Sequence, residues 1–104
     1  MNPAPKNPGR ASSLPATIAY AEAFVAESDA AETARQRAED LGLESVSPGA
    51  ATTLSFLARA LAAKTVVEIG TGTGVSALAL LAGMAPDGVL TSIDAEAEHQ
   101  LAAR

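Results

Sequence analysis

A turn rich in glycine and flanked by acidic residues lies in the middle of the chain. It runs from Gly70 to Gly74 with threonines between the glycines, Glu68 lies two residues before it, and Asp94 lies twenty residues after it. Glycines at the end of a strand let the backbone turn tightly and let a ligand come close. A helix that begins there presents unpaired N–H groups and the positive end of its dipole. These residues predict a crevice that binds a nucleotide-like ligand.

The spacing and charge of this turn narrow the choice of ligand. The dinucleotide fingerprint requires glycines at its first, third and sixth positions, but the sixth position here is Val75. No Gly-Lys-Ser/Thr sequence follows, so a P-loop is excluded. Glu68 would repel a pyrophosphate resting on the turn, whereas it would attract a ligand that carries a cation at that point.

S-adenosylmethionine fits this pattern of charge. Its ammonium group would bind Glu68, and its carboxylate would bind the helix N-terminus and the Ser76 hydroxyl. Asp94, at the end of the next apolar run, is placed to accept both ribose hydroxyls. Two carboxylates and one helix end would therefore recognise one zwitterionic nucleoside.

The elements that position these residues form one βαβ unit over residues 65–94. The apolar run 66–69 predicts a strand, residues 75–84 have a helical apolar pattern, and the run 89–93 predicts a second strand. Because such a crossover is right-handed, both strand ends lie on the same edge of a parallel sheet. Glu68 and Asp94 are therefore expected to face one crevice.

The fold class that follows is α/β, with N-terminal helices before the first βαβ unit of a Rossmann-like sheet. Two parallel strands bury too little surface to be stable alone, and the chain stops inside an expected helix at Arg104. We therefore expect the N-terminal half of a larger, truncated domain. We predict a disordered arm over 1–13, helices over 14–64 and the first half of the ligand-binding domain over 65–104.

Three helices are expected before the sheet. The first begins at Pro15 and ends near Glu27, the second is capped by Asp29 and ends before Gly42, and the third starts at Ser47-Pro48 and ends near Lys64. After the second strand, His99 lies among polar residues and is expected to be a solvated surface residue.

Composition excludes several classes of function. The net charge is −5, with only seven lysines and arginines, so no basic stripe is available to bind nucleic acid. The chain has no cysteine, hence neither a disulfide framework nor a cysteine-based metal site. No apolar run is long enough to span a membrane, and the N-terminus lacks the apolar core of a signal peptide. We expect a cytoplasmic protein.

The sequence Val-Glu-Ile-Gly-Thr-Gly-Thr-Gly-Val-Ser over 67–76, with Ile93-Asp94 downstream, resembles the class I methyltransferases. Together with the helix around Tyr20-Ala21-Glu22 and the connection 46–49, it looks like their catechol-type, cation-dependent O-methyltransferase family. The resemblance covers roughly residues 15–104. It implies that the residues contacting S-adenosylmethionine are Val46, Glu68, Gly70, Thr71, Ser76 and Asp94.

The resemblance also implies a reaction. In that family a divalent cation, usually magnesium, holds a small catechol-like or phenolic substrate near the methyl group of the cofactor. The catalytic base and the metal ligands of the family lie beyond the matching segment, so we assign no catalytic or metal-binding residue to this chain. The N-terminal helices of related enzymes contribute to dimer contacts, which makes a homodimer possible here.

Two alternatives remain open from the sequence. An NAD-dependent oxidoreductase would use the same strand, turn and acidic residue, although the glycine spacing and Glu68 oppose it. A non-catalytic, truncated fragment is supported by the missing metal ligands and by the helix that is cut at Arg104.

Overall fold

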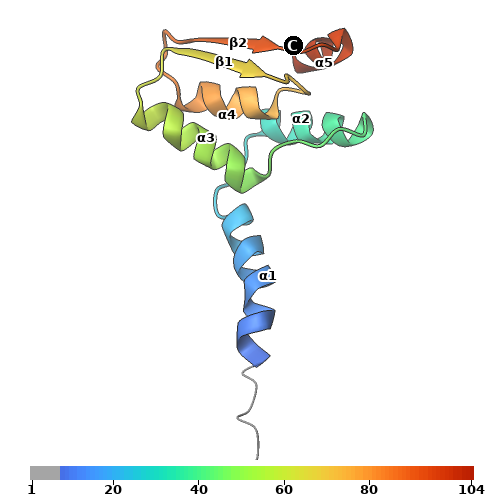
Figure 1. The fold of residues 1–104 in the computed structure, drawn as a ribbon, viewed down its shortest axis with the longest axis vertical. Helices are drawn as coiled ribbons and strands as arrows, with labels where there is room; N and C mark the ends of the chain where they lie inside the picture. The colour runs from blue at the N-terminus through green and yellow to red at the C-terminus, as the bar shows by residue number, and fades with distance from the viewer. Residues whose placement is uncertain (1–7) are drawn as a thin grey trace, which may run out of the picture.

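The computed structural model describes residues 8–104, with side chains from residue 13 onward. The helices and strands, in chain order, are α1 (Pro8–Ala23), α2 (Asp29–Asp40), α3 (Pro48–Ala60), β1 (Thr65–Ile69), α4 (Val75–Gly83), β2 (Val89–Ile93) and α5 (Ala97–Ala103). The sheet lies at one end of the molecule with α4 beneath it, while α1 projects away from the other end (Figure 1). This is the expected α/β arrangement of helices followed by one βαβ unit.

The two strands pair in parallel, as predicted. Thr65 lies opposite Val89 and Ile69 lies opposite Ile93. A further hydrogen bond from the Gly70 amide to the Ile93 carbonyl, 2.7 Å long, continues the pairing beyond the last strand residue. Exposed and half-buried residues alternate along both strands. Since successive side chains of a strand point to opposite faces, one face is shielded and the other is open.

Helix α1 differs from the prediction at both ends. It begins at Pro8 rather than Pro15 and ends at Ala23 rather than near Glu27, and Pro15 lies inside it. Proline suits the first position of a helix, and Pro8 fills that position as well as Pro15 would. The expectation of an arm over 1–13 is therefore wrong for residues 8–13, whereas residues 1–7 lie outside the described part of the chain.

The caps of α2 and α3 explain where these helices begin. Ser28, not Asp29, is the N-cap of α2, and its hydroxyl accepts a hydrogen bond from the Ala31 amide. Asp29 instead occupies the first turn, where an acidic side chain is stabilised by the helix dipole. Ser47 caps α3 as predicted and Pro48 is its first residue, but α3 ends at Ala60, before Lys64.

The buried apolar core is small, and most of its residues are alanines. A close contact between α3 and α4 adds to it. Its apolar members are Ala34, Ala38, Ala51, Ala58, Val75 and Met84. Gly83 at the end of α4 lies directly against the backbone of Ser55 in α3. Small residues thus let α2 and α3 each approach α4 closely beneath the sheet.

No helix within residues 8–104 combines the length and the apolar character that crossing a bilayer requires.

Candidate functional site

A cavity of about 230 Å³ lies where β1 runs into the glycine turn. One wall comes from the turn and the start of α4, and the other comes from the connection between α2 and α3. Its lining residues are Ala38, residues 43–46, residues 70–73, Val75 and Ser76. Four residues predicted to bind the cofactor, Val46, Gly70, Thr71 and Ser76, therefore line one cavity.

The glycine turn adopts a backbone that other residues rarely take. Gly70, Gly72 and Gly74 have φ values of 93°, 52° and 93°, in the left-handed region that glycine enters without steric cost. Gly74 is the N-cap of α4 and supplies no side-chain cap. The first N–H groups of α4 are consequently not covered by a capping side chain, and the helix end is suited to an anionic group.

Glu68 does not line the cavity and is held by hydroxyl groups. Its two carboxylate oxygens accept hydrogen bonds of 2.7 Å each, one from Ser76 Oγ and one from Ser92 Oγ. Ser92 is also 2.8 Å from the Thr71 hydroxyl. Glu68 and Ser76, predicted to bind different ends of the methionine portion, are thus in contact with each other in this structure.

Asp94 organises the turn from the end of β2. Its Oδ2 atom accepts from the amides of Thr71 and Gly72, at 2.9 and 3.1 Å, and its Oδ1 atom accepts from the Glu96 amide at 2.9 Å. The pKa of Asp94 is lowered to about 2, first by the Glu96 amide and then by its other donors. A carboxylate that accepts several N–H groups stays ionised, so Asp94 is negatively charged at neutral pH.

His99 is not the free surface residue that the sequence suggested. Its Nδ1 atom lies 3.2 Å from Asp94 Oδ2, and 23% of its side chain is exposed. In the structure α5 begins at Ala97, and its first turn brings His99 back over the end of β2. His99 therefore contacts the residue assigned to the ribose.

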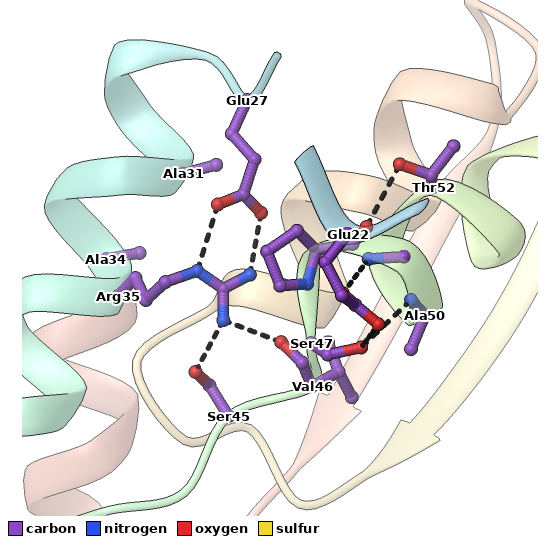
Figure 2. A network of polar contacts seen from close by, with 12 residues as sticks. Glu22, Glu27, Ala31, Ala34, Arg35, Ser45, Val46, Ser47, Ala50 and Thr52 are labelled. Atoms are coloured by element: carbon purple, nitrogen blue, oxygen red, sulfur yellow. Dashed lines mark hydrogen bonds and ion pairs between the residues drawn. The ribbon is translucent and has the colours of Figure 1, made fainter. Parts of the chain in front are cut away.

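The opposite wall of the cavity is held by Arg35, which sequence reasoning missed. Arg35 donates to both Ser45 Oγ and the Val46 carbonyl oxygen, at 3.0 and 2.6 Å, while Glu27 accepts from its other side (Figure 2). The hydrogen bonds with Glu27 raise the pKa of Arg35 above its usual value. An arginine followed by a glutamine and a second arginine on a helix looks like a solvated residue, so the sequence carries no sign of this role.

A second link joins the glycine turn to α2. The hydroxyl of Thr73 is buried and donates to the Ala34 carbonyl at 2.6 Å. The two walls of the cavity are therefore connected through α2.

A divalent cation has no ligand set in the described part of the chain. Residues 8–104 contain no group of three or more His, Cys, Asp or Glu side chains that could hold a metal ion. The residues present do not fit such an ion, and we derive no chemical step through one.

A family model described as O-methyltransferase matches residues 17–104. The chain belongs to the O-methyltransferase family. The match includes the glycine turn, both strands and the whole of helices α2, α3, α4 and α5.

Relatives of this chain are close in sequence but longer. It is 48% identical over 103 residues to a protein of Mycobacterium sp. (strain KMS) named "Putative O-methyltransferase", covering 99% of this chain and 46% of the relative. A protein of the same name from Mycobacteroides abscessus is 50% identical over 93 residues, which are 89% of this chain and 43% of that protein. The chain thus spans less than half the length of these relatives.

Solved structures share the fold. The O-methyltransferase TomG from Streptomyces achromogenes, involved in tomaymycin synthesis and solved in complex with S-adenosylmethionine, matches with a TM-score of 0.77. It is 30% identical, and the match covers 86% of this chain and 41% of TomG. An O-methyltransferase from Bacillus cereus matches with a TM-score of 0.76 at 24% identity, over 86% of this chain and 42% of that one, which shows the fold alone.

Proposed function

We propose that this chain binds S-adenosylmethionine and is the cofactor-binding part of an enzyme that methylates a hydroxyl group on a small, catechol-like or phenolic compound. The observation that carries the proposal is the meeting of Glu68, Asp94 and the start of α4 around the glycine turn. Membership of the O-methyltransferase family and the cofactor bound to TomG support it.

The cavity suits the amino-acid end of the cofactor. Its volume of about 230 Å³ is below the roughly 300–1,000 Å³ of sites that enclose a whole small molecule. The start of α4 would bind the carboxylate, with the Ser76 hydroxyl turning from Glu68 toward it, while Glu68 would attract the ammonium group. Val46 and the backbone of Gly70 and Thr71 would form the walls.

Asp94 would bind the ribose while keeping its hold on the turn. An ionised carboxylate offers about four lone-pair sites, and Oδ1 has a single donor, the Glu96 amide, within residues 8–104. The carboxylate therefore keeps acceptor capacity for a ribose hydroxyl. Its negative charge at neutral pH favours that contact.

The transfer itself needs only one bond exchange. The substrate oxygen attacks the methyl carbon in line with the sulfur, an O–C bond forms, the S–C bond breaks with its electron pair returning to sulfur as a neutral thioether, and the hydroxyl proton passes to solvent. The residues of this chain would bind and orient the methyl donor, which reduces the barrier by positioning. We assign the proton acceptor to no residue here, and magnesium, a homodimer and a cytoplasmic location remain predictions.

Calorimetric titration tests the proposed cofactor. We expect saturable binding of S-adenosylmethionine, a loss of affinity of about tenfold or more in Glu68→Ala because a charged partner is removed, and no saturable binding of NAD. Glu98→Ala, which removes an exposed carboxylate from α5, is the matched control and should bind like the wild type.

Two results would contradict the proposal. Tight binding of NAD would favour the oxidoreductase alternative. A folded chain, as judged by circular dichroism, that gives no heat of binding with S-adenosylmethionine would favour a fragment without a cofactor site.

A further inference from the structure

The connection between α2 and α3 forms one wall of the cofactor cavity without belonging to a helix or strand. We infer that Arg35, oriented by Glu27, is a positioning residue that fixes Ser45 and Val46 in this wall for the amino-acid end of the cofactor. The inference rests on the proposed function and assigns a further residue to it. Arg35 does not line the cavity, so it acts through the connection.

Arg35 lies at the centre of four hydrogen bonds (Figure 2). Its Nε and Nη2 atoms donate to the two carboxylate oxygens of Glu27, at 2.9 and 2.6 Å. Its Nη1 atom donates to Ser45 Oγ and to the Val46 carbonyl oxygen. Both charged side chains are largely buried, with 21% of Arg35 and 17% of Glu27 exposed. The bidentate pair fixes the plane of the guanidinium group and thereby the direction of Nη1.

The connection depends on this arginine for its polar contacts. Within residues 8–104, the stretch from Glu44 to Val46 makes no hydrogen bond other than the two with Arg35. The stretch is anchored on one side by the Leu43 amide, which donates to Ala38, and on the other by Ser47, which caps α3. The amide of Val46 has no partner in the same part of the chain, which leaves it available to a ligand.

Lysine cannot replace arginine in this arrangement. A lysine ammonium group can pair with Glu27, but it lacks the planar fork that contacts a carboxylate and two oxygens of the connection at once. Arg35→Lys therefore keeps the charge and most of the side-chain volume while releasing Ser45 and Val46. A released connection would have to be ordered when the ligand binds, at a cost to affinity.

The test compares two ligands that share the methylthioadenosine portion, of which only one carries the amino-acid end and, with it, the sulfonium charge. S-adenosylmethionine and 5′-methylthioadenosine are titrated into the full wild-type chain, into Arg35→Lys and into Arg37→Lys. Arg37 lies on the same helix, is exposed and donates to the Ala102 carbonyl, so its variant is the matched control. Circular dichroism checks that each variant is folded, and Glu27→Gln, which loosens the fork without altering Arg35, carries the test if Arg35→Lys does not fold.

We expect Arg35→Lys to weaken S-adenosylmethionine binding by about tenfold while 5′-methylthioadenosine binding changes by less than about twofold. Glu27→Gln should give the same pattern at about threefold, and Arg37→Lys should change neither affinity. Equal losses for both ligands would show that Arg35 supports only the fold, and unchanged binding of both would show that it positions nothing. Either result overturns the inference, whereas a wild-type chain that binds no S-adenosylmethionine overturns the proposed function on which it rests.

Discussion

The two faces of the parallel sheet differ in how the chain uses them. On the covered face, Glu68 and Ser92 lie side by side and connect through Ser76 to α4, which packs beneath the strands (Figure 1). We call the other side the open face; its residues are Thr65, Val67, Ile69, Val89, Thr91 and Ile93. Ile69 is 88% exposed there, so apolar side chains of the open face bury little surface within the described chain.

The order of the site and the stability of the fold come from different interactions. Hydrogen bonds organise the site, whereas burial of apolar surface stabilises the fold. The cavity is organised by hydrogen bonds of the α2–α3 connection, the glycine turn and the covered face, and none of these bonds uses a side chain of the open face. Burial of apolar surface, the main favourable term in folding, comes mostly from alanines and from Val75 and Met84. The site is therefore well ordered in a chain with a small core.

The tightest contact beneath the covered face should be the most sensitive to substitution. In Gly83→Ala, the new methyl group would collide with the Ser55 carbonyl group and lie 3.0 Å from the Ala58 methyl. Because α3 and α4 must then separate, we expect a loss of about 3 kcal/mol in the free energy of unfolding, measured with urea. Ala82→Ser also adds one atom, but at an exposed neighbour, and should cost less than about 0.5 kcal/mol. Equal losses in the two variants would contradict the close contact.

A pair of substitutions compares the two faces directly. Met84, the C-cap of the helix α4 that packs beneath the covered face, is 7% exposed, and Met84→Ala should cost about 2 kcal/mol of unfolding free energy through lost burial and a cavity. Ile69→Thr on the open face keeps a β-branched residue and should cost less than about 0.5 kcal/mol. If Ile69→Thr costs as much as Met84→Ala in urea unfolding, another surface covers the open face in solution.

The sequence was sufficient for the parts of the fold that depend on local patterns. The two apolar runs, the glycine turn and the Ser47-Pro48 cap predicted β1, β2, the start of α4 and the start of α3, because strand periodicity and capping act over a few residues. The predicted start of α1 was wrong because two prolines, Pro8 and Pro15, suit the first turn of a helix equally well. Local signals could not choose between them.

In the site, too, some features followed from the sequence pattern and others did not. The placement of Glu68 and Asp94 at the same edge of the sheet followed from the crossover rule, since parallel strands end on one edge, but neither residue lines the cavity. The roles of Arg35 and His99 depend on contacts across ten and five residues of an irregular path, and no periodicity encodes them. That Glu68 and Ser76 bind each other was also not predictable, because both were interpreted only as partners of a ligand.

Acid should weaken the hydrogen bonds by which Asp94 holds the glycine turn. The pKa of Asp94 is lowered from 3.8 to about 2 in the folded chain, so its contribution to stability is present above pH 3.8 and is lost as the pH falls toward 2. We expect the urea midpoint of the wild type to fall over this range. Asp94→Asn should be less stable at neutral pH and should lose less on acidification. Parallel curves for the two proteins would show that other carboxylates dominate.

The smallest change in the free energy of unfolding is expected for a substitution of Glu22, which holds the projecting helix α1. Glu22 at the end of α1 accepts hydrogen bonds from the Gly49 amide and the Ser47 hydroxyl, at 2.6 and 3.1 Å. In Glu22→Ala, we expect α1 to detach locally while the rest stays folded, so chymotrypsin should cleave after the exposed Tyr20 and Phe24 a few times faster. The urea midpoint should change little, because none of the α1 residues from 13 to 23 is buried. A large fall in that midpoint would instead show that α1 is part of the cooperative unit that contains the covered face.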